Sequence, residues 1–235
     1  MQMAKVPLER LTEKLGVRFA RIELLNEALT HRSYLNENPS WPLPNNERLE
    51  FLGDAAIELA VTEFLYKKFP DKQEGELTSL RASLVNYQML GSIAKDIGVE
   101  AHLLLSRGEA KDTGKAREVI LANAMESVIG AVYLDQGYES VRDVVGRIIM
   151  PRLDAIIEKG LYRDPKSALQ EVIQERLRLT PTYRVMSENG PDHQKLFRVG
   201  VYFGEVCGAE GTGTSKQEAE AKAAETALEK FKNSN

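Results

Sequence analysis

The chain has 235 residues, of which 43% are hydrophobic and 28% are charged, and its formal net charge is −4. This length suffices for one large domain or two modest ones with separate cores, and the small negative charge argues against a generic binder of polyanions. A single cysteine, Cys207, excludes an intramolecular disulfide, and no apolar run approaches the roughly 18 residues of a membrane span. We therefore expect a cytoplasmic protein with no membrane-spanning segment.

From Pro7 to about Lys159 the hydrophobic residues recur at helical spacing, and no strand with clear alternation is expected. The pattern predicts helical segments around Leu8–Leu15 and Ile22–Leu29, a long helix capped by Asn45 or Asn46 and ending at Phe69, a second long helix over Glu74–Ile97, a loop over Ser106–Lys115, and two further helices near Ala116–Asp135 and Glu139–Lys159. The first part of the chain is therefore predicted to be mostly α-helical.

The pattern changes after Gly160. A helix from Lys166 to about Leu179 precedes three runs of strand-like alternation, at Thr182–Ser187, Leu196–Phe203 and Val206–Thr214, and a final helix covers Ser215–Phe231. We predict an N-terminal helical domain over residues 1–159, a linker over 160–164, and a small α+β domain of order α-β-β-β-α over 165–235.

Three carboxylates in the first long helix share one face. Glu47, Glu50 and Asp54 follow each other at helical spacing, and their neighbours are mostly apolar. Carboxylates in such surroundings persist when protonated, paired or bound to a cation, and Mg²⁺ prefers hard oxygen ligands. The alternative is an ordinary solvated acidic face, with Arg48 balancing its charge. Gly53 in the same helix indicates that a ligand or another element lies close beside Asp54.

A second polar pair interrupts an otherwise apolar helix. Asn123 and Glu126 are three residues apart in VILANAMESVIGAVYL, and Glu126 is the only charged residue between Glu118 and Asp135. A solitary glutamate on a buried helix is unusual and favours a functional role. The alternative is a core carboxylate paired with an arginine such as Arg81.

These segments together resemble the ribonuclease III family. The resemblance rests on the run NERLEFLGDA at residues 46–55, ALTHRSY at 28–34, QEGELTSLRASLV at 73–85 and ILANAMESVIGAVYLD at 120–135. It implies the helical fold of ribonuclease III and an enzyme that requires Mg²⁺, for which Mn²⁺ can substitute.

The resemblance also implies residue roles. Asp54 and Glu126 would be catalytic, and the ion would be held by Glu50, Asp54, Asn123 and Glu126. The family usually has aspartate where this chain has Asn123, whose carbonyl oxygen can still bind a cation but carries no charge. Accessory acids would be Glu47 and Glu74, and Phe51 would insert into the partner subunit of a homodimer.

The C-terminal segment resembles a double-stranded-RNA-binding domain through SALQE at residues 167–171 and GTGTSKQEAEAKAAETAL at 211–228. Such domains span about 16 bp of an A-form duplex. The resemblance implies RNA contacts from Gln170, Glu171, His193, Lys216 and Lys222. Gln217 stands where a second basic residue is common, and residues 164–235 hold 10 Lys and Arg against 11 Asp and Glu. We therefore expect weak or salt-sensitive binding.

The resemblance implies an endoribonuclease that cuts double-stranded RNA in rRNA and mRNA precursors, leaving 5′-phosphate and 3′-hydroxyl ends. The alternative is a catalytically weakened double-stranded-RNA-binding protein, which Asn123 alone favours. A helical domain used only for dimerisation would leave the acids unexplained.

Overall fold

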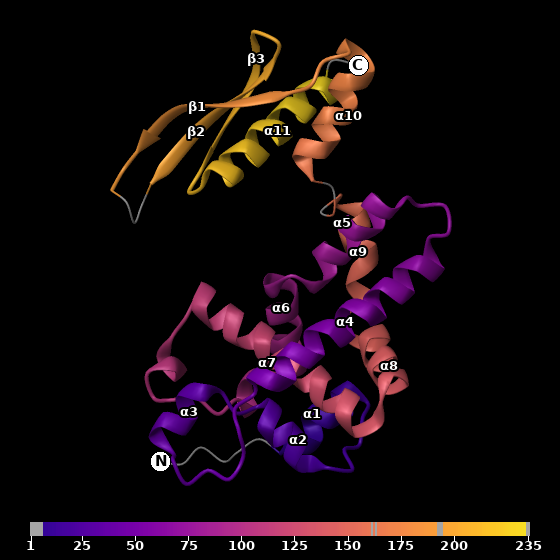
Figure 1. The fold of residues 1–235 in the computed structure, drawn as a ribbon, viewed down its shortest axis with the longest axis vertical. Coiled ribbons are helices and arrows are strands. Elements are labelled where there is room, and N and C mark those ends of the chain that lie inside the picture. The colour runs from indigo at the N-terminus through magenta and orange to yellow at the C-terminus, as the bar shows by residue number, and fades with distance from the viewer. Residues whose placement is uncertain (1–6, 161, 163, 192–194, 234–235) are drawn as a thin grey trace. The chain divides into compact units, whose positions relative to one another are not determined.

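The computed structural model describes residues 7–160, 162, 164–191 and 195–233. The chain divides into two compact units, Met1–Tyr162 and Arg163–Asn235 (Figure 1). Each unit has its own hydrophobic core, large in the first and built around alanines and a few aliphatic residues in the second.

The first unit is helical, as expected, and its longest helices are α4 and α7. These two make the most extensive packing contact of the unit, α6 packs against α7, and α8 packs against both. The helices are α1 Leu8–Leu15, α2 Ile22–Ala28, α3 Arg32–Glu37, α4 Glu47–Lys68, α5 Glu74–Val85, α6 Tyr87–Ile97, α7 Lys115–Gln136, α8 Tyr138–Ile148 and α9 Leu153–Glu158, with 3-10 turns η1 Val99–His102, η2 Glu109–Lys111 and η3 Met150–Arg152.

Two predicted helices of this unit are each broken in two. The segment Glu74–Ile97 breaks at Asn86, which is extended (φ −73°, ψ 161°) and whose side chain accepts a hydrogen bond from the Met89 amide to cap α6. The segment Glu139–Lys159 breaks around Pro151, which lacks an amide hydrogen and cannot continue a helix. Hydrophobic spacing runs through both breaks, so spacing alone did not reveal them.

The second unit has the predicted α-β-β-β-α order. Its elements are α10 Pro165–Leu177, β1 Thr182–Asn189, β2 Leu196–Phe203, β3 Val206–Gly213 and α11 Lys216–Asn233. The strands form one antiparallel sheet in the order β1-β2-β3, and α11 packs against β2, β3 and α10 (Figure 1).

The two faces of this sheet differ. Val199 and Val201 are buried on the helix side. Gly200 points to the other side, where a Cβ would lie 3.1 Å from Met186 Sδ and 3.4 Å from Cys207 Sγ. Cys207 is an exposed free cysteine, and so lies on the face that the helices leave open.

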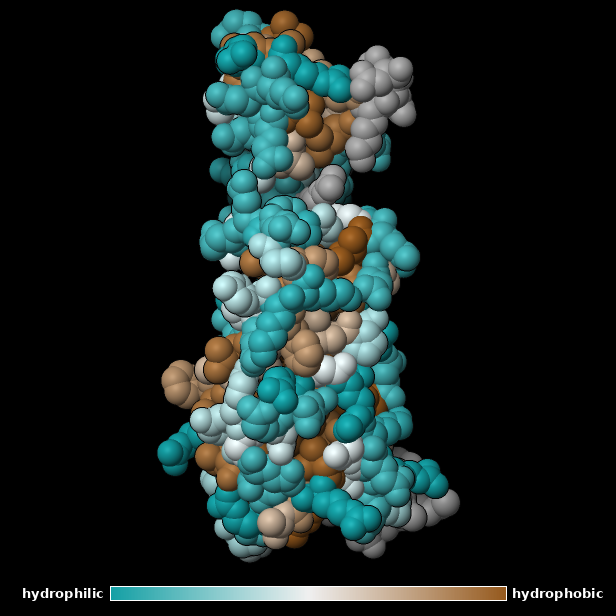
Figure 2. All heavy atoms as spheres, turned by 90° about the vertical axis from the view of Figure 1, so that its right-hand side faces the viewer, coloured by the Kyte–Doolittle hydropathy of each residue, from teal (hydrophilic) through white to brown (hydrophobic). Residues whose placement is uncertain are grey.

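No helix in the described part of the chain is long and apolar enough to cross a membrane. The face in Figure 2 is largely hydrophilic, and hydrophobic residues appear on it in separate groups.

Candidate functional site

Two glycines allow α4 and α7 to cross in backbone contact. A Cβ on Gly53 would lie 1.8 Å from the backbone oxygen of Glu126, and one on Gly130 would lie 2.2 Å from the backbone oxygen of Leu49. No side chain fits at such distances, so only glycine permits this approach. The expectation that another element lies close beside Asp54 is confirmed.

The crossing brings the polar residues of both helices within range of each other's charge. Burial, followed by the charges of the nearby Asp54 and Glu50 carboxylates, raises the pKa of Glu126 to about 7. Burial also raises the pKa of Glu50, as do the charges of Glu47 and Asp54, while a hydrogen bond from the Asn123 side chain opposes the shift. The predicted metal-binding residues of α4 and α7 therefore gather in one place.

No cation compensates Glu126 within the described residues. The pKa of its carboxyl is shifted only by burial and by acids. Arg81, considered above as its partner, donates instead to Thr62 Oγ1 at 3.1 Å. The interpretation of Glu126 as a core carboxylate paired with Arg81 is therefore wrong.

Glu47 lies at the exposed edge of this group and has partners that spacing did not reveal. Arg32 Nη1 lies 3.5 Å from its carboxylate, and Asn45 Nδ2 donates to the carboxylate at 3.3 Å. Asn45 Oδ1 also accepts from the Glu47 amide, whereas the Asn46 side chain donates to the carbonyl of Ala28. The side chain of Asn45, and not that of Asn46, therefore accepts a hydrogen bond from a backbone amide at the start of α4. The only signal for Arg32 was its place in ALTHRSY.

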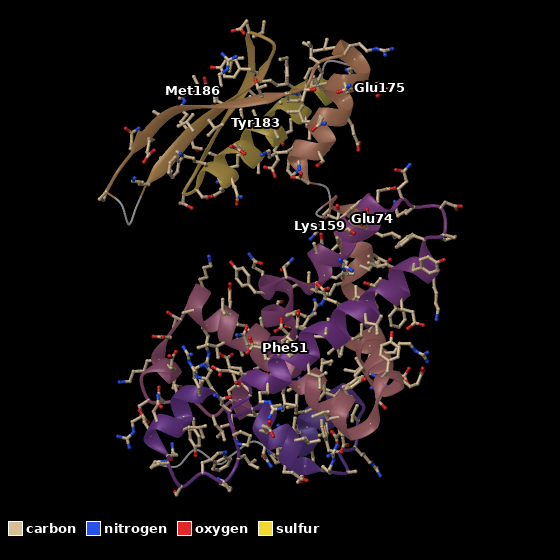
Figure 3. The ribbon with its side chains drawn as sticks, viewed as in Figure 1. Phe51, Glu74, Lys159, Glu175, Tyr183 and Met186 are labelled. Carbon is tan, nitrogen blue, oxygen red and sulfur yellow. The ribbon has the colours of Figure 1, made fainter. Side chains whose placement is uncertain are left out.

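Glu74 does not join the group within one chain. It begins α5, where its carboxylate accepts a hydrogen bond from Thr78 Oγ1 at 3.0 Å. Figure 3 shows it well away from Phe51, the neighbour of Glu50 on α4. A contribution of Glu74 to the same reaction would have to come from another chain or through the substrate.

The gathered residues have the chemistry of a hard-cation site. Glu50, Asp54 and Glu126 are carboxylates on two packed helices, and repulsion among them favours binding of a divalent ion. Across the described residues, no three acidic, histidine or cysteine side chains converge closely enough to ligate one ion. Asn123 donates a hydrogen bond to Glu50, and the Glu50 carboxylate has a second oxygen with which it could bind Mg²⁺.

Phe51 projects from α4 and is 83% exposed. Leu59 and Tyr66 follow at helical spacing on α4 and are 57% and 73% exposed. Three large apolar side chains along one exposed face are typical of a surface that another molecule covers. Sequence reasoning missed Leu59 and Tyr66 because α4 is apolar on most of its sides.

In the second unit, the proposed RNA contacts on α10 are accessible. Gln170 and Glu171 are exposed and share one helix face with Ser167 and Gln174. His193 lies outside the described residues.

The two lysines of α11 have different surroundings. Lys216 Nζ lies 5.8 Å from the centre of the Phe197 ring. Lys222 Nζ donates to the Glu218 carboxylate at 2.8 Å. Only Lys222 is thus held in an ion pair with a neighbour on its own helix.

Comparison with known proteins agrees with both units. Residues 21–153 match the family described as Ribonuclease-III-like, and residues 165–231 match the double-stranded RNA binding motif. The chain is 41% identical over 231 residues to a Ribonuclease 3 of Borreliella burgdorferi, covering 98% of this chain and 94% of that protein. The chain belongs to the ribonuclease III family of endoribonucleases.

Further similarities support this placement. A Ribonuclease 3 of Desulforamulus reducens is 45% identical over 221 residues, which are 94% of this chain and 89% of that protein. The solved nuclease domain of a ribonuclease III from Campylobacter jejuni, described with a region involved in dimer formation, matches with a TM-score of 0.56 and 39% identity, over 62% of this chain and 97% of that one. The chain therefore has the predicted order of a helical nuclease domain and a domain with the double-stranded RNA binding motif.

Proposed function

We propose that this protein is a Mg²⁺-dependent endonuclease that hydrolyses double-stranded RNA to 5′-phosphate and 3′-hydroxyl ends in rRNA and mRNA precursors. The observation that carries the proposal is the group of uncompensated acids where α4 crosses α7, in a chain that also has a double-stranded RNA binding motif.

In this proposal Glu50, Asp54, Asn123 and Glu126 hold the ion, and Asp54 and Glu126 act at the reacting phosphate. The ion held by these residues would supply activation of the attacking water and stabilisation of the departing oxygen, as metal ions do in phosphodiester hydrolysis. Without the ion the pKa of Glu126 is about 7, so binding of Mg²⁺ would release its proton and leave the carboxylate as a ligand.

The accessory residues follow from their positions. Arg32 and Asn45 fix the Glu47 carboxylate at the edge of the group. Glu74, remote from the group within one chain, serves the same reaction through the substrate or a partner.

We also propose a homodimer with Phe51 at its interface. Support comes from the exposed stripe on α4 and from the dimer-forming region named for the Campylobacter jejuni domain.

The endonuclease domain would be residues 1–159, joined by the linker 160–164 to the RNA-binding domain 165–235. The residues of this second domain that meet the duplex would be Gln170, Glu171, His193, Lys216 and Lys222. Lone Cys207 suits the reducing cytoplasm.

The test is cleavage of a long RNA duplex in Mg²⁺, in Mn²⁺ and in chelator, by the protein and by Asn123→Asp. Adding a carboxylate should lower the Mg²⁺ concentration for half-maximal rate by roughly 3- to 10-fold, because ligand charge tunes affinity. Gln136→Glu is the matched control, since it adds the same charge about 20 Å further along α7. Absence of cleavage by either protein with every metal would refute the enzyme, and cleavage by Asn123→Asp alone would identify a weakened RNA-binding protein.

A further inference from the structure

Glu218 makes an unusual set of contacts at the start of α11. Its amide donates to Ser215 Oγ at 3.1 Å, and its Oε2 accepts from both the amide and the hydroxyl of Thr214, each at 2.7 Å. This arrangement closes the first turn of α11 in the manner of a capping box.

The second oxygen of the same carboxylate binds a lysine. Oε1 of Glu218 accepts from Lys222 Nζ at 2.8 Å. The hydrogen bond from Lys222, followed by those from Thr214, lowers the pKa of Glu218 to about 2. The carboxylate is therefore ionised at every pH at which the protein would meet RNA.

The Thr214 amide and hydroxyl and the Lys222 ammonium are hydrogen-bond donors of the kind that bind phosphate. A helix N-terminus offers free backbone amides and a positive dipole end to an anion, and lysines add charge. We infer that Glu218 is an internal competitor for RNA phosphate, holding the Thr214 donors and neutralising Lys222 until a duplex displaces it. This inference rests on the proposed binding of double-stranded RNA by α11.

The competition must be mild. The side chains of Lys222 and Glu218 are 50% and 41% exposed, and exposed ion pairs contribute little stability. A phosphate can therefore replace the carboxylate at small cost. The effect is a lowered affinity, because the duplex must break the bonds of Glu218 before Lys222 meets a phosphate, and it accounts physically for the weak binding that the charge balance predicts.

The test compares Glu218→Gln with Glu225→Gln in the full chain. Both remove one negative charge from α11, and Glu225 has no ion pair among the described residues. Glutamine can still close a capping box. Binding of a 20-to-25-bp RNA duplex is measured by fluorescence anisotropy in chelator, from about 50 to 300 mM KCl, where phosphate contacts dominate affinity.

We expect Glu218→Gln to tighten binding about 3- to 10-fold at low salt, because Lys222 then meets a phosphate without first leaving a carboxylate. Glu225→Gln should change affinity less than about 2-fold. Equal effects of the two variants, or weaker binding by Glu218→Gln, would overturn the inference.

Lys222→Gln, made both in the unaltered protein and in Glu218→Gln, supplies a second readout. It leaves the hydrogen bonds at the start of α11 in place. It should weaken the original protein less than it weakens Glu218→Gln, because only in Glu218→Gln is the lysine unpaired before the duplex binds. The same effect in both backgrounds would also overturn the inference. Failure of the unaltered protein to bind any duplex would instead refute the proposed function, so the two failures are distinguishable.

Discussion

At the scale of single residues, Glu126 makes the metal-free protein sensitive to pH. Its pKa is raised to about 7 from an ordinary value of 4.5. Between these values the folded state holds a proton that the unfolded state has released, so the free energy of unfolding must fall as pH rises from about 5 to about 8. After allowance for solvent screening, we expect a loss of roughly 1–2 kcal/mol.

Urea denaturation in chelator, followed by the fluorescence of the single tryptophan Trp41, measures this loss. Glu126→Gln should flatten the pH dependence of the free energy of unfolding and should be more stable than the unaltered protein at pH 8. Glu23→Gln, a change at an exposed glutamate, should leave that pH dependence unchanged. The same slope in all three proteins would contradict the assigned pKa.

The spacing of residues along one helix was sufficient to predict that some site residues lie together, but not others. Glu50 and Asp54 are one helical turn apart, so their shared face followed from the sequence alone. Their meeting with Glu126 depends on a crossing of two helices far apart in the chain, for which Gly53 was the only local hint. The position of Glu74 is set by tertiary structure and could not be derived from spacing.

At the scale of elements, the crossing of α4 and α7 carries the site. We expect Gly53→Ala to destabilise the first unit by roughly 3 kcal/mol or more, since overpacking against backbone leaves no side chain that can yield. Gly75→Ala is the control: nothing lies within 4 Å of its Cβ position in α5, so alanine should stabilise by about 0.5–1 kcal/mol. Urea midpoints measure both, and a tolerated Gly53→Ala would refute the close crossing.

Helices were predicted correctly where the sequence marks their ends clearly. Both α4 and α7 were found because each is a long apolar run, and Pro70 marks the end of α4. The break at Asn86 was missed because asparagine interrupts a helix only when its side chain caps the next one, which depends on the backbone it adopts.

At the scale of the whole molecule, the exposed stripe of α4 should govern assembly. Phe51→Ala removes a side chain that is 83% exposed in the single chain. A buried aromatic anchor contributes about 2–3 kcal/mol, so the dimer dissociation constant should rise roughly 30- to 150-fold. Sedimentation equilibrium measures it, with Val206→Ala, 69% exposed in the other unit, as control. An unchanged constant would place the interface elsewhere.

The open face of the C-terminal sheet has a practical consequence. Cys207 is the only cysteine of the chain, it is exposed, and it lies on the face of the sheet away from α10 and α11. A maleimide dye would therefore attach at one known position without engineering the protein, and it would leave free the helix surfaces assigned to RNA. The unaltered chain thus carries its own attachment point for watching a single molecule arrive on, and leave, a duplex.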